Sequence, residues 1–284
     1  MSNAQQIRRD TGPVAADFTI DQRWNAYTAE EHARWDALLE RMAKLLRGRA
    51  CKTYLGAVDK IALSDGGIPD MERLSDRLDA LTGWRVVPVA GLVPDEVFFD
   101  HLANRRFPSG TFIRSAAEFD YIEEPDVFHD IFGHVPLLAD PTYAAFMQAY
   151  GAGGARAIAA NALPMLARLY WYTIEFGLIV EDDELRLFGA GIMSSPEETR
   201  FALDNPSPNR LGFDLERVMQ TDYRIDDMQE TYFVIDSFES LLSAAHRDFG
   251  PIYAQFAEAP NHTPGTVLDG DTVFHRGSGA HFGL

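Results

Sequence analysis

The spacing of apolar residues in the first part of the chain predicts two amphipathic helices. Thr28 is followed three positions later by Glu31, which is a capping box, and apolar residues then recur every three or four positions up to Gly48. A second pattern of this kind begins at Pro69-Asp70 and ends at Gly83. Proline and aspartate favour helix starts and glycine favours helix ends, so both segments have the expected boundaries.

The same pattern continues along the chain with few strand signals. The segment 84–89 is short and alternates poorly, so we expect extended chain there. The sequence predicts a mainly α fold with a few short β-strands. Further helices are expected at 94–104, 124–132, 141–150, 164–178, from 195 onward and at 237–257, and strands at 186–190, 212–215 and 231–235.

These elements predict one catalytic domain over residues 21–258. Residues 1–20 are polar and aperiodic, and residues 259–284 are rich in glycine, so we expect a flexible N-terminal tail and a weakly ordered C-terminal tail. The sequence contains no internal repeat and no sustained heptad pattern. Solenoid and coiled-coil architectures are therefore not expected.

Composition and charge narrow the classes of partner. The net charge is −18 and the pI is near 4.7, whereas a nucleic-acid binder needs a basic surface to neutralise phosphates. The single cysteine, Cys51, excludes an intramolecular disulfide and fits a reducing compartment. Because apolar runs stop well short of the ~20 residues that span a bilayer, we expect a cytoplasmic protein with neither a nucleic-acid nor a membrane partner.

The most informative segment holds two histidines, His129 and His134, in apolar surroundings. On a straight α-helix positions i and i+5 lie about 140° apart, so both rings reach one ion only if the backbone departs from ideal geometry. Gly133 and Pro136 make such a departure inexpensive. The spacing is one residue longer than that of the zinc-protease motif HExxH, and Asp130 stands where that motif has glutamate.

A third ligand is available in Glu175, which lies within a run of apolar and aromatic residues. A carboxylate in such surroundings costs several kcal/mol unless it is paired or binds a metal. The alternative is a salt bridge to Arg168, two helical turns earlier. Both interpretations are open at this point.

Two imidazoles and one carboxylate on one side of an ion leave its other side open, which is typical of non-haem Fe(II) oxygenases. A zinc site would more usually be tetrahedral or keep one water. The sequence leaves two other hypotheses: a zinc-dependent hydrolase, and a binding module in which His129, His134 and Glu175 are satisfied core groups.

Several motifs together resemble the catalytic domain of the pterin-dependent aromatic amino acid hydroxylases. The resemblance runs from about residue 20 to about residue 258 and is strongest to the single-domain bacterial enzymes that act on phenylalanine. Three separate motifs in the right order make a chance match very improbable. They are EPDVFHDIFGHVP, ARLYWYTIEFGL and FGAGIMSS, with support from VAGLVPDEVFFDHLANRRFP, SPNRLGFDL and TYFVIDSF.

The resemblance implies roles for individual residues. It places a ferrous ion on His129, His134 and Glu175, and a tetrahydropterin beside Val93, Asp95, Phe98, Ala167 and Tyr170. It assigns Arg114 to the substrate carboxylate, for which a bidentate guanidinium is well suited, and Ile122, Trp171, Phe176 and Ser194 to the pocket around the ring. Without the resemblance, Phe98 would be taken as core and Arg114 as a surface arginine.

The implied reaction is conversion of L-phenylalanine to L-tyrosine with O2, Fe(II) and tetrahydropterin; tryptophan or tyrosine is the alternative substrate. Two positions differ from the animal enzymes: Asp130 replaces a glutamate, and Pro108 replaces a histidine near the pterin. With no room for a regulatory domain and no C-terminal heptads, we expect a monomer.

Overall fold

The computed structural model describes residues 12–120, 122 and 124–283. Contacts between residues divide the chain into two compact units. Unit 1 comprises the residues up to Lys44 with Thr53–Gly153, and unit 2 comprises Leu45–Lys52 with Gly154–Leu284. Much of the tail expected at residues 1–20 lies outside the described residues. Among the described residues, no helix is both long enough and apolar enough to cross a membrane.

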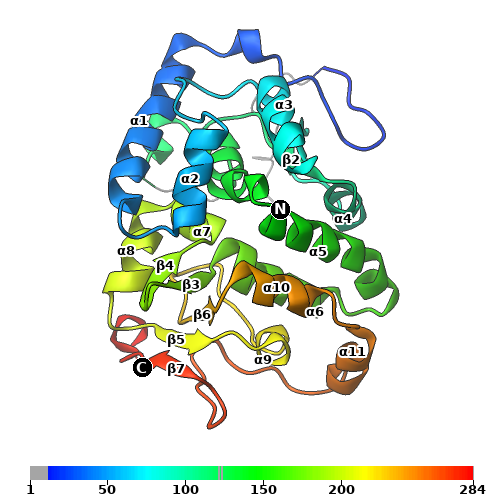
Figure 1. Cartoon of the computed structure of the whole chain (residues 1–284), viewed down its shortest axis with the longest axis vertical. Coiled ribbons are helices and arrows are strands. Elements are labelled where there is room, and N and C mark those ends of the chain that lie inside the picture. The colour runs from blue at the N-terminus through cyan, green and yellow to red at the C-terminus, as the bar shows by residue number, and fades with distance from the viewer. Residues whose placement is uncertain (1–11, 121, 123, 284) are drawn as a thin grey trace. The chain divides into compact units, whose positions relative to one another are not determined.

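Unit 1 is mostly helical, with one short sheet (Figure 1). Strands β1 and β2 pair in parallel, and Arg85 lies opposite Arg106. Its core is aromatic: the ring of Phe128 stacks on Phe132, with the centroids 4.8 Å apart, and the edge of Trp35 packs on Phe128. The elements from α1 to α5 are α1 (Ala29–Leu46), α2 (Lys52–Lys60), α3 (Met71–Thr82), β1 (Arg85–Pro88), α4 (Asp95–Ala103), β2 (Arg106–Ser109), the π-helix η3 (His129–His134), η4 (Pro136–Ala139) and α5 (Pro141–Ala159).

Unit 2 contains a five-stranded mixed sheet with strand order β4-β3-β6-β5-β7. The central strand β6 is buried along its whole length. It pairs in parallel with β3 and β5, while β4 and β7 add antiparallel edges. The elements are α6 (Leu163–Tyr170), the π-helix η5 (Trp171–Glu175), β3 (Leu178–Glu181), β4 (Glu184–Leu187), α7 (Ala190–Met193), α8 (Pro196–Asp204), β5 (Asn209–Gly212), α9 (Leu215–Met219), β6 (Thr231–Ile235), α10 (Phe238–Ala245), α11 (Gly250–Phe256) and β7 (Val273–His275).

Local signals placed several elements correctly. The Thr28–Glu31 capping box forms in both directions, because the Glu31 carboxylate accepts from the Thr28 backbone N–H and the Thr28 hydroxyl from that of Glu31. Helix α3 begins after Asp70, whose carboxylate caps it, and ends at Gly83 in the left-handed conformation. Strand β6 has the predicted bounds.

Other predicted helices and strands had the wrong bounds or were missed. The segment 164–178 is not one helix: α6 gives way to η5 and then to strand β3. The segment 237–257 is two helices, since Gly250-Pro251 starts a new one. Strands β4 and β5 lie two or three residues before their predicted starts, and α2, β2, β3 and β7 were not predicted.

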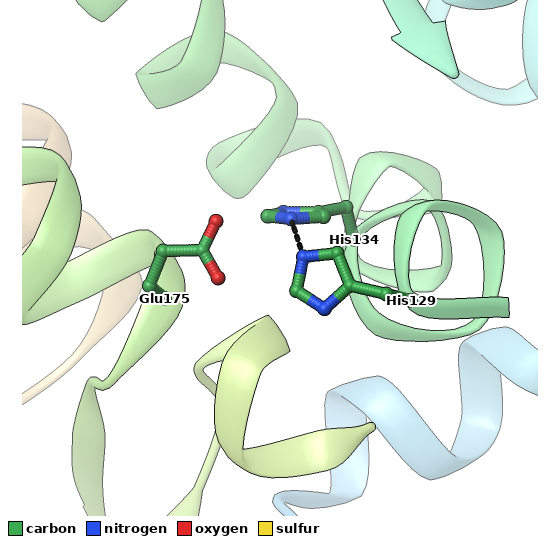
Figure 2. Close-up of side chains that lie close together, drawn as sticks. All are labelled: His129, His134 and Glu175. Carbon is green, nitrogen blue, oxygen red and sulfur yellow. Dashed lines mark hydrogen bonds between the residues drawn. The ribbon is translucent and has the colours of Figure 1, made fainter. Parts of the chain in front are cut away.

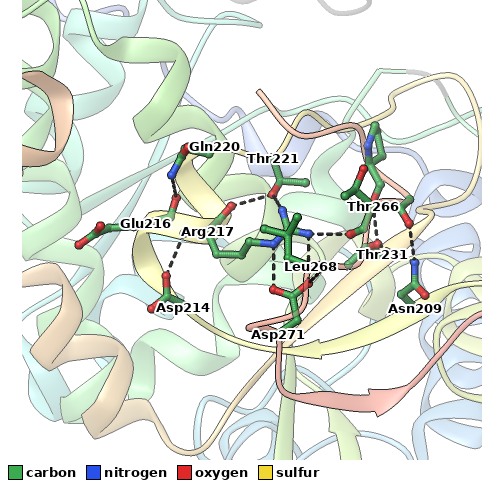
Figure 3. Close-up of polar contacts among 12 residues, drawn as sticks. Asn209, Asp214, Glu216, Arg217, Gln220, Thr221, Thr231, Thr266, Leu268 and Asp271 are labelled. Carbon is green, nitrogen blue, oxygen red and sulfur yellow. Dashed lines mark hydrogen bonds and ion pairs between the residues drawn. The ribbon is translucent and has the colours of Figure 1, made fainter. Parts of the chain in front are cut away.

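The C-terminal segment carries more structure than its glycine content predicted. Strand β7 pairs with β5, and the side chain of Arg217 in α9 binds the segment at two points (Figure 3). Its guanidinium donates to the Asp271 carboxylate at 3.0 Å and to the Thr266 carbonyl at 2.6 Å. The expectation of a weakly ordered tail at 259–284 overlooked this long-range anchor.

Candidate metal and substrate site

The two histidines lie at the ends of a single π-helical turn, η3. A π-helix bonds residue i to i+5, so five positions complete about one turn and both side chains leave the helix on the same side. The Nε2 atoms of His129 and His134 are 3.2 Å apart. His134 is buried and His129 is half-buried. The departure from ideal helix expected before Pro136 is therefore confirmed, and Pro136 opens the next turn, η4.

Asp126 fixes the start of this turn. Its carboxylate is fully buried and accepts from the His129 backbone N–H at 3.0 Å. The same carboxylate accepts from Nε and Nη2 of Arg114, at 2.9 and 2.8 Å, and from its backbone N–H. Because a buried carboxylate needs such partners, Asp126 ties the guanidinium of Arg114 to the backbone that carries His129.

Glu175 ends the second π-helical turn, η5. The Phe176 N–H donates to the Trp171 carbonyl, which is the i to i+5 bond of this helix type. The proposed salt bridge with Arg168 does not form, because Arg168 binds the Asp222 carboxylate at 2.7 Å. A Cβ added at Gly189 would lie 2.4 Å from the Glu175 carbonyl oxygen, so this glycine is needed for close packing behind the ligand turn.

His129, His134 and Glu175 come together (Figure 2). Their candidate ligand atoms all lie within 4.8 Å of one another. Among the described residues, no other group of three or more histidine, cysteine or acidic side chains has this arrangement. Two imidazole nitrogens and one carboxylate oxygen suit a ferrous ion, and three protein ligands leave positions for other molecules.

Comparisons with known proteins agree with this geometry. Residues 4–256 match the family model of the biopterin-dependent aromatic amino acid hydroxylases. The chain belongs to this family. It is 56% identical to phenylalanine-4-hydroxylase of Caulobacter vibrioides, covering 93% of this chain and 90% of that protein, and 52% identical to that of Chromobacterium violaceum, covering 93% and 89%.

The fold agrees with solved structures of the family. A crystal structure of C. violaceum phenylalanine hydroxylase bound to cobalt superposes with a TM-score of 0.90 at 51% identity, covering 92% of this chain and 95% of that one. The family resemblance is thus confirmed, and the prediction of a mainly helical fold agrees in part, because unit 2 also contains a five-stranded sheet. The family match also spans both compact units.

In this hydroxylase the predicted pterin residues lie in two places. Val93 and Asp95 stand at the start of α4; Val93 is half-buried and Asp95 exposed. Phe98 is half-buried and meets Phe99 edge-on, with centroids 5.8 Å apart. Ala167 and Tyr170 are half-buried on α6. Phe98 is thus not an ordinary fully buried core residue, and the pterin contacts stay predictions.

Arg114 is buried, with 3% of its surface exposed, so the alternative of a surface arginine is wrong. Its guanidinium lies 5.7 Å from the centroid of the Phe128 ring. Among the described residues, no hydrogen-bond partner is found for its third nitrogen, Nη1. An arginine held by a carboxylate on one edge can bind a second carboxylate on the other.

The remaining predicted substrate residues differ in their surroundings. Trp171 and Phe176 are half-buried neighbours with ring centroids 4.7 Å apart. Ser194 is buried, and its hydroxyl donates to the Ala190 carbonyl at 2.8 Å. Ile122 is half-buried. Their contact with substrate stays a prediction.

Sequence reasoning missed Asp126 and Gln229, which contact predicted site residues. Asp126 stands three positions before His129, the spacing of a helix cap, so the signal was present in the sequence. Gln229 binds Trp171, 58 positions earlier, and no local pattern reveals such a contact.

Proposed function

We propose that this chain is a phenylalanine 4-monooxygenase, which converts L-phenylalanine to L-tyrosine with O2 and a tetrahydropterin. The observation that carries the proposal is the convergence of His129, His134 and Glu175 within 4.8 Å, in a chain about half identical to phenylalanine-4-hydroxylases over nearly its whole length. The two other hypotheses, a zinc hydrolase and a binding module, have no comparable support.

His129, His134 and Glu175 would hold the ferrous ion. When bound, the ion and the reduced pterin supply the electrons and open coordination positions that activation of dioxygen requires. The two π-helical turns present the three ligands, and Asp126 keeps the His129 turn in place through the backbone N–H.

Arg114 would bind the carboxylate of the amino acid. Asp126 occupies Nε and Nη2 of its guanidinium, and the Phe128 ring lies alongside, so the side chain has a single orientation. A fixed guanidinium orients the substrate as well as binding it. Ile122, Trp171, Phe176 and Ser194 would shape the pocket for the aromatic ring.

Val93, Asp95, Phe98, Ala167 and Tyr170 would contact the pterin. The half-buried ring of Phe98 offers an apolar face for a planar cofactor. Pro108 is a buried residue of β2 and cannot supply the hydrogen bonds of a histidine. The pterin must therefore be held by other groups in this chain.

The direct test is a product assay. The iron-loaded protein with a tetrahydropterin and O2 is expected to form tyrosine from phenylalanine, with little product from tryptophan. Omission of pterin, iron or O2 should abolish the product. Activity with zinc that does not require O2 would instead support a hydrolase. If the parent shows no turnover, and a His134→Ala variant has the same metal content as the parent, a binding module would be supported.

We further infer a monomer that works in the cytoplasm. The lone cysteine, Cys51, is buried, which suits a reducing compartment but does not require it. Light scattering coupled to gel filtration should give a mass near 31.7 kDa. A mass twice as large would contradict the monomer.

A further inference from the structure

The indole of Trp171 is held from three directions within unit 2. Trp171 is the first residue of η5, the π-helical turn that ends at Glu175. Its ring stacks on Tyr223, with centroids 4.3 Å apart and planes 15° from parallel, and Phe176 contacts it at 4.7 Å. Its only polar atom, Nε1, donates to the Gln229 side-chain oxygen at 2.8 Å. Stacking fixes the plane of the indole, and the hydrogen bond fixes its rotation within that plane.

Gln229 can satisfy this network in one orientation only. Its side chain is 3% exposed, and its amide nitrogen donates to the Arg224 carbonyl at 3.0 Å. An indole N–H can only donate and a carbonyl can only accept, so the amide cannot turn over without losing both bonds. A buried amide whose oxygen and nitrogen are both bonded in one orientation is a rigid support.

The segment that provides these contacts, residues 222–230, is itself held in place. Arg224 pairs with Asp226 at 3.0 Å and with Glu230 at 3.5 Å, so its side chain links the two ends of this part of the segment. The Tyr172 hydroxyl donates to the Asp222 carbonyl at 2.6 Å, and Arg168 binds the Asp222 carboxylate. Tyr172 belongs to η5, so the segment and the π-helical turn are joined at several points.

We propose that Gln229 is a positioning residue that acts through Trp171, whose indole it holds in one orientation beside the substrate ring. The inference rests on the proposed function, because it takes Trp171 as a wall of the substrate pocket. Gln229 holds the edge of the indole and Tyr223 supports its face. A shift of the indole would change the room for the substrate ring.

The main test is a double-mutant cycle between Gln229 and Trp171. Gln229→Met keeps the length of the side chain and removes both hydrogen bonds. We expect about a tenfold rise in KM for phenylalanine, a change in the ratio of kcat/KM for phenylalanine over tryptophan, and a pterin KM within about twofold of the parent. In a Trp171→Phe background, which lacks the N–H, Gln229→Met should change these values less than about twofold.

Tyr223 supplies a matched pair of variants. Tyr223→Phe keeps the stacked ring and should leave the substrate ratio unchanged, whereas Tyr223→Leu removes the ring and should shift the ratio in the same direction as Gln229→Met. Iron content and melting temperature, measured on each variant, identify any that have lost the fold. If Gln229→Met has equal effects in both backgrounds, or raises the KM values of both substrates equally, the positioning role is overturned.

A fluorescence measurement separates this inference from the proposed function. The emission of Trp171 is the difference between the parent and its Trp171→Phe variant, and Gln229→Met should shift that difference spectrum. If the parent forms no tyrosine but the spectrum shifts, the proposed function fails and the contact between Gln229 and Trp171 stands. If the parent forms tyrosine and neither spectrum nor kinetics respond, only the positioning role fails.

Discussion

Two buried arginine–aspartate pairs, one in each compact unit, are nearly alike in local chemistry. Arg114 binds Asp126, and Arg217 binds Asp271, in both cases through Nε and Nη2. Each guanidinium also lies 5.7 Å from the centroid of a phenylalanine ring, Phe128 or Phe233. The pairs differ in what surrounds them.

All three nitrogens of the Arg217 guanidinium bind the protein, because Nη1 donates to Thr221 and Nη2 also to the Thr266 carbonyl. Asp126, in contrast, also binds the backbone of His129, and for Nη1 of Arg114 no partner is found among the described residues. A saturated arginine anchors structure, and one with an unused edge beside a metal ligand is suited to bind substrate. The use of the remaining nitrogen therefore distinguishes the two roles.

The largest effect is expected at Arg217. Arg217→Met leaves the buried Asp271 carboxylate without its partner, which costs about 3–5 kcal/mol for a broken buried pair. Urea denaturation should show this loss in the free energy of unfolding. The double variant Arg217→Met/Asp271→Asn should recover part of it, and variant protein that stays folded should keep its KM for phenylalanine. A loss below about 1 kcal/mol would contradict the anchoring role.

For Arg114 we expect the main effect on the kinetics with phenylalanine, instead of on the free energy of unfolding. Arg114→Lys keeps the charge and loses the planar fork, so kcat/KM for phenylalanine should fall about 10²–10³-fold, mainly through KM. The pterin KM should stay within about twofold. Steady-state kinetics with varied phenylalanine, then with varied pterin, give both values. An unchanged KM for phenylalanine would exclude a carboxylate-binding role.

A third buried acid, Glu198, sharpens the comparison because its side-chain partner is a hydroxyl instead of an arginine. The Tyr232 hydroxyl donates to its carboxylate. Burial raises the pKa of Glu198 to about 7, and hydrogen bonds from Tyr232 and the Gln229 backbone only partly offset this. The folded protein therefore holds a proton that the unfolded chain releases above about pH 4.5.

Glu198 makes the free energy of unfolding depend on pH. Between about pH 4.5 and 7 the folded state binds more protons than the unfolded state, so Glu198 lowers stability as the pH rises through this window. The loss amounts to roughly 3 kcal/mol. The measurement is the free energy of unfolding of the parent and of Glu198→Gln at pH 5 and at pH 8. Relative to the parent, the variant should be more stable at pH 8 than at pH 5. A difference independent of pH would rule out this titration.

The sequence predicted the parts of the fold that depend on local signals. Caps and glycine stops placed α1 and α3, and the unusual spacing of His129 and His134 predicted a departure from α-helical geometry that proved to be a π-helix. Strands β2 and β7 were missed because their partners, β1 and β5, lie about 20 and 60 residues away. Arg217 orders the glycine-rich end of the chain through contacts 49 and 54 positions away, which composition could not reveal.

At the site, the grouping of His129, His134 and Glu175 was predictable because an isolated carboxylate and two histidines in apolar sequence require an explanation. The correct partner of Arg168 was not, since Asp222 is 54 positions distant. Asp126 was within reach of sequence reasoning, and Gln229 was not. Candidate metal ligands can thus be predicted from their chemistry, whereas long-range contacts such as that of Gln229 with Trp171 are seen only in the fold.

The central claim is that His129, His134 and Glu175 bind one ferrous ion on which turnover depends. Its most direct test is the iron content of purified protein reconstituted with ferrous iron, measured alongside tyrosine formation in the parent, His134→Ala and Glu175→Ala, with Glu184→Ala as an exposed-carboxylate control. We predict about one iron per chain and full activity in the parent and control, and loss of both in the two ligand variants. Full iron content and undiminished tyrosine formation in Glu175→Ala would contradict the claim.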